Sequence, residues 1–295
     1  MSIDTPDLNK SNNLSNSSKV LYTISDNGVA TVTLNNAEKH NAFDDTIIKT
    51  LTDIFSDIAK RDDVKVMVLA ANGKSFSAGA DLGWMKRMAS YSYEDNLKDA
   101  NALAQMLKAL NFMPQATIAK IQGAAFGGAV GLASCCDIVI ASNKASFCLS
   151  EVKLGLIPAT ISPYVVNAIG LKASRRYFQT AERFFADKAM QIGLVDEVVD
   201  AADLTPAVEK MITTLLNNSP TAMRQAKQLA FDVAYQDINE QLLSDTSARI
   251  ASIRVSSEGQ EGLSAFFDKR SPAWQQSANL TSNHLASSQC NDSEG

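Results

Sequence analysis

The alternation of strand-like and helix-like segments constrains the fold of this chain more than any other feature of its sequence. Val29–Leu34 (VATVTL) alternates valine and threonine as a strand would, and Asp44–Asp62 then places apolar residues at helical spacing. Lys65–Ala70 (KVMVLA) has the pattern of the next strand. Strands that alternate with helices at this density predict an α/β layer fold.

The alternation continues to about residue 203 and then stops. The later strands are predicted over Thr117–Ile121, Asp137–Ala141 and Ser146–Leu149, and the later helices over Glu94–Asn111, 128–136 and 161–180. Beyond residue 203 only helices are predicted, over Leu204–Leu216, Pro220–Tyr235, Asn239–Val255 and Glu258–Lys269. Because amphipathic helices bury their apolar faces, this region is expected to pack on the core, on another subunit, or on both.

The chain is therefore expected to form one globular unit between two polar tails. Residues 1–18 and 275–295 are rich in serine and asparagine, and this composition predicts disorder. The α/β core is assigned to residues 19–203, and the helical region to residues 204–274.

Charge and apolar patterning argue against several classes of function. The net charge of −5 does not indicate a nucleic-acid footprint. The N-terminal segment has no apolar stretch typical of a signal peptide, and no run approaches the roughly 18 apolar residues of a membrane span. The cysteines form neither a disulfide framework nor a metal-ligand spacing, which favours a reducing compartment. We therefore expect a cytoplasmic protein that binds neither nucleic acid nor membrane.

The scarcity of histidine disfavours triad and metal-dependent chemistry. The chain has only His40 and His284, and His284 lies in the polar C-terminal tail, so a catalytic triad would have to use His40. No GxSxG accompanies His40, which is expected instead to make a loop or helix-terminus contact. No HxxxH or CxxC spacing predicts a metal site, and the glycines match neither the dinucleotide-binding nor the phosphate-loop pattern.

Two glycine-bearing turns remain as candidates for a site. Ser75–Leu82 (SFSAGADL) and Gly123–Ala129 (GAAFGGA) each follow a predicted strand and precede a predicted helix. Small residues let a ligand approach the backbone and leave peptide N–H groups open, and Gly128 would begin a helix whose positive end favours an anion. Two such donors aimed at one carbonyl oxygen form an oxyanion hole. Close packing is the alternative explanation for either turn taken alone.

Glu151 is an acidic residue within the otherwise apolar segment FCLSEVKLGLIP. Apolar surroundings disfavour the ionised form, so the pKa of this carboxyl is expected to rise towards a value useful in acid–base catalysis. An exposed glutamate paired with Lys153 is the alternative, and the pattern alone does not decide between the two.

The two turns and the Glu151 segment together resemble the enoyl-CoA hydratase/isomerase (crotonase) superfamily. The motifs FSAGADL, IQGAAFGGAVGLASCCDIVIAS and FCLSEVKLGLIP occur in that order, and the resemblance extends from about Val29 to Trp274. It implies an α/β fold built as a spiral of ββα units, with a C-terminal α-helical trimerisation region. It also implies a homotrimer or a dimer of trimers, and an acyl-CoA thioester whose coenzyme A is part of the substrate, with no separate cofactor and no metal.

The resemblance assigns roles to particular residues. The peptide N–H groups of Ala80 and Gly128 would form the oxyanion hole, and Glu151 would be the catalytic carboxyl group. The other matches would bind the acyl-CoA: Ala80, Asp81, Leu82, Gly83 and Gly128 along the acyl thioester, and Lys39, His40, Ala78 and Asp81 near the adenine and pantetheine. Phe267 and Lys269 match the last helix, which in some relatives caps the coenzyme A of a neighbouring subunit.

One position departs from the pattern of the hydratases. They usually carry a further glutamate shortly after the hole glycine, where this chain has Gly131, whereas relatives that shift a double bond between positions 3 and 2 often keep only the later glutamate. Longer stretches such as SEVKLGLIPATISPYVVNAIG and RRYFQTAERF resemble bacterial methylglutaconyl-CoA hydratases, which also lack the first glutamate. The expected function is hydration of 3-methylglutaconyl-CoA to 3-hydroxy-3-methylglutaryl-CoA in leucine and isovalerate breakdown. A Δ3-Δ2-enoyl-CoA isomerase and a non-catalytic acyl-CoA- or RNA-binding protein remain as alternatives.

Overall fold

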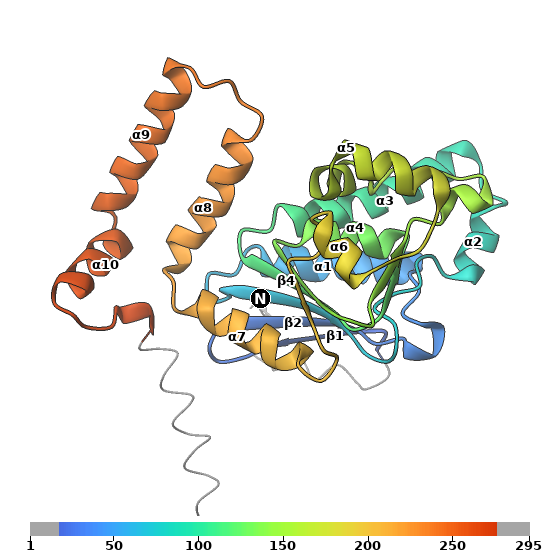
Figure 1. Ribbon diagram of the computed structural model, residues 1–295, viewed down its shortest axis with the longest axis horizontal. Helices are drawn as coiled ribbons and strands as arrows, with labels where there is room; N and C mark the ends of the chain where they lie inside the picture. Colours follow the sequence, from blue (N-terminus) through green and yellow to red (C-terminus); the bar gives the residue numbers. More distant parts are fainter. Residues whose placement is uncertain (1–17, 276–295) are drawn as a thin grey trace, which may run out of the picture.

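The computed structural model describes residues 18–275, so the two segments expected to be disordered tails lie, apart from Ser18 and Gln275, outside the described residues (Figure 1). The strands are β1 (Val20–Ile24), β2 (Val29–Leu34), β3 (Val66–Ala71), β4 (Ala116–Ile121), β5 (Ala124–Phe126), β6 (Ile138–Ser142), β7 (Ser146–Cys148), β8 (Phe184–Phe185) and β9 (Glu197–Val199). The α-helices are α1 (Asp45–Ile58), α2 (Leu82–Met88), α3 (Tyr93–Asn111), α4 (Gly128–Cys135), α5 (Ser162–Thr180), α6 (Ala186–Gln191), α7 (Leu204–Leu216), α8 (Pro220–Val233), α9 (Glu240–Val255) and α10 (Ser257–Phe267). The 3₁₀ helices are η1 (Ala37–Lys39) and η2 (Glu151–Leu154).

A six-stranded sheet carries the α/β part of the chain. Its strand order is β1-β2-β3-β4-β6-β9, and every neighbouring pair is parallel except β1 and β2. The first three parallel connections pass through α1, through α2 and α3, and through β5 and α4, and the fourth, from β6 to β9, passes through β7, α5, β8 and α6. The predicted α/β class is therefore confirmed, with strands and helices alternating up to β9.

The strand period of two divides the apolar side chains of this sheet between two cores. Met67 and Leu69 belong to the large core that also contains buried residues of α1, α3 and α4, whereas Val66 and Val68 belong to a smaller cluster. Leu204 of α7 lies in that smaller cluster. Helix α7 therefore covers the sheet face opposite α1, α3 and α4 (Figure 1).

A second, three-stranded sheet has the order β5-β7-β8. The prediction that the GAAFGGA segment is only a turn is wrong at Ala124–Phe126, which forms β5 and pairs in parallel with β7. A strand of 3 residues is too short to show a period of two, and its pairing partner follows α4 and β6 in the chain. This small sheet places the ends of β5 and β7 side by side, and both lead into candidate site residues.

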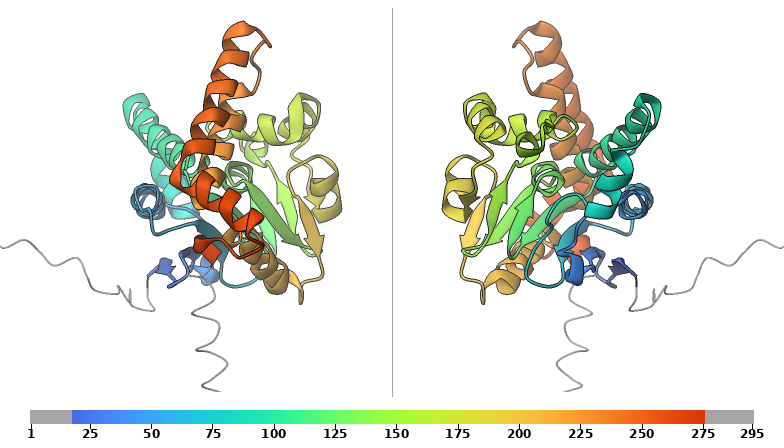
Figure 2. Two further views of the ribbon diagram at one scale, coloured as in Figure 1. Left: turned by 90° about the vertical axis from the view of Figure 1, so that its left-hand side faces the viewer. Right: turned by 90° about the vertical axis from the view of Figure 1, so that its right-hand side faces the viewer.

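Helices α8, α9 and α10 extend away from the α/β part (Figures 1 and 2). Helix α8 is tied to the core by Arg224, which donates to the carbonyl oxygens of Arg61 and Val64 at 3.1 and 3.0 Å, and by Lys227, which pairs with Asp137 at 2.7 Å. Many large apolar side chains of this region are exposed: Phe231, Tyr235, Ile238, Leu243, Ile250, Val255, Leu263, Phe266 and Phe267. The helical region thus buries apolar surface on its own core chiefly through α7.

Most predicted elements are confirmed, with differences at their ends. The strand Val29–Leu34 and the helix Leu204–Leu216 have the predicted bounds. The helix predicted over Asp44–Asp62 ends earlier, at Ile58. The helix predicted over 161–180 is kinked, because Gly170 has φ 74° and ψ 160°, outside the helical region.

Candidate active site

The first glycine turn is bridged to the segment that precedes α1. Phe43 donates its N–H to the carbonyl oxygen of Gly79 at 2.7 Å and accepts from the N–H of Asp81 at 2.7 Å, which forms a parallel bridge to Ala80. In a parallel bridge, the residue between the two bonded ones directs its own N–H and C=O to the other side. The peptide N–H of Ala80 therefore points away from Phe43.

The first turn is also paired with the second. Ser77 donates to the carbonyl oxygen of Ala124 at 3.0 Å and accepts from the N–H of Phe126 at 2.9 Å, which forms a parallel bridge to Ala125. This pairing sets the register between the first turn and the chain leading to Gly128. The relative position of the two expected donors thus depends on backbone hydrogen bonds rather than on flexible side chains.

The second turn leads from β5 into α4. The N–H of Gly127 donates to the carbonyl oxygen of Cys148 at 2.9 Å, which anchors this turn to the end of β7. Helix α4 begins at Gly128, whose N–H is among the first-turn donors that a helix leaves without an internal acceptor. Among the hydrogen bonds of residues 18–275, none uses the peptide N–H of Ala80 or Gly128. Both expected donors are therefore available to a ligand.

Glycine is required at one position in each turn. Gly79 has φ +92°, and a Cβ there would lie 3.1 Å from the carbonyl oxygen of Phe126. Gly127 has φ +53°, and a Cβ there would lie 3.3 Å from Oε1 of Glu151. A side chain at Gly127 would therefore press against the carboxyl group of Glu151, which lies directly beside the second turn.

Glu151 presents an unsatisfied carboxyl oxygen at this place. Strand β7 ends at Cys148, and Glu151 begins the 3₁₀ helix η2. Its Oε2 is buried and has no hydrogen-bond partner among the described residues. Burial raises the pKa of Glu151, because the charged form loses hydration. A buried acceptor without a partner, beside the turn that leads to the open N–H of Gly128, is the arrangement expected of a carboxyl that acts on a bound ligand.

The alternative ion pair of Glu151 with Lys153 is not formed. No salt bridge of the described chain involves Lys153 or Glu151. The carboxyl group is turned towards Gly127 instead.

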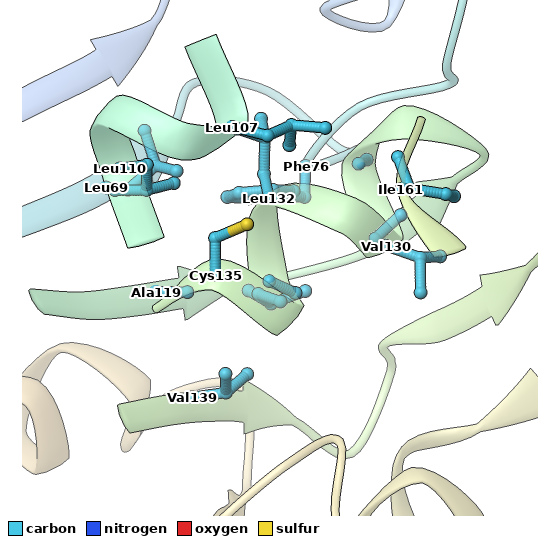
Figure 3. Packing of buried hydrophobic residues seen from close by; sticks show 14 of the residues in the cluster. Leu69, Phe76, Leu107, Leu110, Ala119, Val130, Leu132, Cys135, Val139 and Ile161 are labelled. Atoms are coloured by element: carbon cyan, nitrogen blue, oxygen red, sulfur yellow. The ribbon is translucent and has the colours of Figure 1, made fainter. Parts of the chain in front are cut away.

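Gly131, at the position where hydratases are expected to carry a further glutamate, is surrounded by apolar side chains. A Cβ there would lie 2.3 Å from Cγ2 and 2.8 Å from Cβ of Ile161, and 3.5 Å from Cδ2 of Leu107. Figure 3 shows Ile161 and Leu107 beside α4, with Val130 on the same helix. Ile161 is 2% exposed. It therefore fills the space that a side chain at position 131 would need.

Two residues expected at the coenzyme A pair with each other. Nζ of Lys39 lies 3.0 Å from Oδ2 of Asp81, and Oδ1 of Asp81 caps α2 by accepting the N–H of Trp84 at 3.0 Å. The Lys39 ammonium and this peptide N–H hold the pKa of Asp81 below its usual range. Leu82 follows and is 75% exposed, and Gly83 packs against the Asp81 carboxylate. Lys39 and Gly83 thus both lie against the carboxylate of Asp81, the residue directly after Ala80.

Phe267 and Lys269 are not brought to this place within one chain. Phe267 ends α10 and is 74% exposed, and Lys269 follows it. Helices α10 and α2 lie at opposite ends of the molecule in Figure 1. Phe267 and Lys269 could therefore meet the Ala80 turn only if a second copy of the chain supplied them.

Some side chains that hold the first turn were not singled out in the sequence. Asn41 is 1% exposed, and its Nδ2 donates to the carbonyl oxygen of Ser75 at 2.9 Å; Nε2 of Gln122 donates to the same oxygen at 3.1 Å. Ala78 donates its N–H to the carbonyl oxygen of His40 at 2.9 Å, and Nδ1 of His40 lies 3.2 Å from Oγ of Ser75. The loop contact expected of His40 is thus confirmed. In the sequence, the only indication that Asn41 and Gln122 hold this turn was that each is a polar residue beside an apolar run.

The side chains of Asp137, Cys135 and Cys136, near the end of α4, have structural rather than catalytic roles. Oδ2 of Asp137 accepts from the N–H of Thr117 at 2.8 Å and from Lys227 at 2.7 Å, so it joins β4 to α8 rather than capping a helix. Cys135 is 2% exposed and Cys136 is half-buried, and burial raises the pKa of both thiols. This burial fits a packing role for both cysteines, and neither is poised as a nucleophile.

Metal ligation and membrane insertion find no support in residues 18–275. No three His, Cys, Asp or Glu side chains gather there as a metal site. In the same part of the chain, no helix combines the length and apolar character needed to cross a bilayer. The chemical groups at the candidate site are two peptide donors and one carboxyl.

Known proteins are similar over most of the chain. Residues 25–277 match the family Enoyl-CoA hydratase/isomerase. An enoyl-CoA hydratase of Alternaria alternata is 33% identical over 253 residues, which cover 84% of this chain and 82% of the relative. The trans-2-decenoyl-[acyl-carrier-protein] isomerase of Streptococcus mutans is 30% identical over 266 residues, which cover 86% and 97%. The crystal structure of an enoyl-CoA hydratase from Shewanella pealeana superimposes with a TM-score of 0.84 at 49% identity, over 87% of this chain and 96% of that one.

Proposed function

Because the chain belongs to the enoyl-CoA hydratase/isomerase family, whose crotonase fold it shares, we propose that it hydrates 3-methylglutaconyl-CoA to 3-hydroxy-3-methylglutaryl-CoA. The observation that carries this proposal is the buried, unpartnered Oε2 of Glu151, whose carboxyl group lies beside Gly127, together with the open N–H groups of Ala80 and Gly128. Two donors and one carboxyl suffice to hold a thioester oxygen and to move one proton. The resemblance to methylglutaconyl-CoA hydratases supports this choice of acyl group.

In this proposal, Ala80 and Gly128 stabilise the negative charge that develops on the thioester oxygen. Both N–H groups belong to turns joined by the pairing of Ser77 with the β5 strand, so they are oriented before the substrate arrives. Donors that need no reorganisation stabilise the enolate more than the ground-state carbonyl. Loss of one such donor typically lowers kcat by about 100- to 1000-fold.

Glu151 carries the proton. As a carboxylate it accepts a proton from water while the water oxygen bonds to the β carbon and the α,β double bond shifts its electrons into the enolate. The same carboxyl then returns the proton to the α carbon as the enolate collapses, so one water is added in total and Glu151 is regenerated. The raised pKa of Glu151 suits this exchange, because it brings the proton-donating and proton-accepting forms closer in free energy.

The missing second carboxylate is replaced by the substrate's own distal carboxylate. The protein surface at Gly131 is closed by Ile161 and Leu107, so the chain offers no carboxylate of its own there. 3-Methylglutaconyl-CoA carries a carboxylate at the end of its acyl chain, whereas crotonyl-CoA does not. We therefore expect crotonyl-CoA to be turned over much more slowly, and equal turnover of the two would refute this step.

A Δ3-Δ2-enoyl-CoA isomerase is the second candidate function. It is favoured by the single carboxyl at the site and by the similarity to the Streptococcus mutans protein, which is named an isomerase. Both reactions pass through an enolate of the thioester, and they differ in whether Glu151 exchanges its proton with water or between two carbons of the substrate. The two donors would have the same role in either case.

We also propose that the working form is a homotrimer or a dimer of trimers in the cytoplasm. The exposed apolar side chains of α8, α9 and α10 support a contact between copies, because such a surface is large for a monomer. In that assembly Phe267 and Lys269 of one copy would reach the coenzyme A held by another. Light scattering after size exclusion would test the assembly, and a monomer at micromolar concentration would refute it.

The absorbance of the conjugated enoyl thioester tests the reaction. Hydration of 3-methylglutaconyl-CoA removes this absorbance, whereas isomerisation of a 3-enoyl-CoA creates it. We expect the absorbance to fall rapidly with 3-methylglutaconyl-CoA, and the rate of this fall to be about 100- to 10,000-fold lower in Glu151→Gln. Glu197→Gln, at an exposed position of β9, is the matched control and should retain wild-type activity. A protein that only increases the absorbance, with a 3-enoyl-CoA, is an isomerase. Full activity of Glu151→Gln would overturn both the hydratase and the isomerase proposal.

A further inference from the structure

Helix α2, which directly follows Ala80 and Asp81, is held to the molecule by one buried side chain. The helix spans Leu82–Met88, is 7 residues long, and has Trp84 as its only buried residue. A helix this short is marginal in water and depends on tertiary contacts. The backbone at Ala80 is set by its bridge to Phe43, and the hold on Trp84 supports it from the side of α2.

Trp84 donates two hydrogen bonds, each to a different carboxylate. Its peptide N–H donates to Oδ1 of Asp81 at 3.0 Å, which fixes the residue directly after Ala80. Its indole Nε1–H donates to Oδ1 of Asp99 on α3 at 3.2 Å. Asp99 is thus linked to the Ala80 turn through a single side chain.

Asp99 is a half-buried carboxylate that the proposed mechanism does not use. Burial raises its pKa, the Trp84 hydrogen bond opposes that rise, and nearby Asp45 and Arg87 act in opposite directions. Asp45 and Arg87 pair with each other at 2.6 Å. Within the described chain, the indole N–H is the one hydrogen-bond donor that Asp99 meets. A half-buried carboxylate is disfavoured unless it is hydrogen-bonded. The hydrogen bond from Trp84 therefore stabilises Asp99 and, in turn, holds the Trp84 side chain in place.

We propose that Asp99 is a positioning residue, which fixes α2 through the Trp84 indole and thereby aims the Ala80 peptide N–H at the thioester oxygen. This inference rests on the proposed role of Ala80 in the oxyanion hole. Misplacement of a reacting or stabilising group by about 1 Å can lower a rate by about 100-fold, so a small movement of α2 is enough to matter.

The test measures how strongly the enzyme polarises a bound carbonyl. A slowly reacting aryl-conjugated enoyl-CoA absorbs at longer wavelength when its carbonyl accepts stronger hydrogen bonds, so its red shift on binding reports on the donors. For Asp99→Leu we expect a smaller red shift and a kcat lower by about 10- to 100-fold, with little change in the Kd of the probe. Asp99→Asn keeps an acceptor oxygen and should keep both the shift and kcat near wild type.

Two further variants keep the test decisive. Trp84→Phe deletes the indole donor while keeping an aromatic side chain, and it should reduce the red shift as Asp99→Leu does, even if the latter folds poorly. Arg87→Ala breaks the other contact of α2, its surface pair with Asp45, and should leave the shift unchanged. The inference is overturned if Asp99→Leu and Trp84→Phe both retain the wild-type shift, or if Arg87→Ala loses as much. No red shift in the wild-type protein would instead overturn the oxyanion hole itself.

Discussion

A single methyl group added at position 131 probes the packing that replaces a carboxylate. In Gly131→Ala, the new Cβ would lie 2.3 Å from Cγ2 and 2.8 Å from Cβ of Ile161. Position 131 is inside α4, where alanine is intrinsically more favourable than glycine by about 1 kcal/mol. Overpacking of a filled core costs about 1–3 kcal/mol. Because Ile161 is 2% exposed and cannot turn into solvent, we expect the overlap to outweigh the helix gain, with a net loss of up to about 2 kcal/mol.

The identity of the clashing neighbour is tested by a double-mutant cycle. Ile161→Ala alone should cost about 2–5 kcal/mol through the cavity it leaves. In the double variant the methyl group at 131 fills part of that cavity. The double variant should therefore lose less stability than the sum of the two single losses, by about 1–2 kcal/mol. Leu110→Ala is the matched control, because Leu110 is a buried neighbour on α3 that is not among the atoms nearest to position 131, and it should be additive with Gly131→Ala.

Urea unfolding followed by circular dichroism gives these free energies from the midpoint and slope. A Gly131→Ala variant that is as stable as the wild type and shows no coupling to Ile161→Ala would show that Ile161 does not fill this space. A Gly131→Glu substitution places a longer side chain in the same filled space. It should therefore destabilise the protein rather than create a two-carboxylate hydratase, unless Ile161 is shortened as well.

Three further predictions concern stability. Asp81→Ala removes the side-chain cap of α2 and should lower the free energy of unfolding by about 1 kcal/mol; an unchanged urea midpoint would contradict the capping role. Lys227→Met leaves the partly buried Asp137 without its cation and should lower the free energy of unfolding by about 1–3 kcal/mol. Lys227→Arg should keep most of that stability, and a Met variant as stable as the wild type would refute the role of this ion pair. Hydrogen bonds from Arg270 lower the pKa of Glu261 from 4.5 to about 2, so its stabilising contribution is present above pH 4.5 and is lost as the pH falls towards 2. Wild type and Glu261→Gln should therefore differ in urea midpoint at neutral pH and converge in acid, and a constant difference would be inconsistent with this ion pair.

The parts of the fold that could be predicted are those with long, regular apolar patterns. Helix α1 and strand β2 carry their periodicity within one segment, and α7 was expected with its observed bounds. Strand β5 could not be predicted, because its pairing depends on β7 and on Ser77, which lie elsewhere in the chain. The kink at Gly170 was likewise hidden within a pattern that is helical on both sides.

At the candidate site, residue types could be predicted but their arrangement could not. Ala80, Gly128 and Glu151 were recognised from short motifs, whereas the two bridges that set their register involve residues distant in sequence. The contact between Trp84 and Asp99 joins two helices and leaves no local signal. The closure of position 131 by Ile161 was equally invisible, because an apolar residue there resembles any other core residue.

In the proposed reaction one carboxyl, Glu151, adds water to an enoyl thioester held by two peptide donors. Incubation of the wild-type protein with 3-methylglutaconyl-CoA in water enriched in oxygen-18 tests it directly by mass spectrometry of the thioester. We predict a product that carries one heavy hydroxyl group, formed at a rate that falls to background in Glu151→Gln and stays unchanged in Glu197→Gln. Incorporation that persists in Glu151→Gln, or a wild-type product of unchanged mass, would contradict the account.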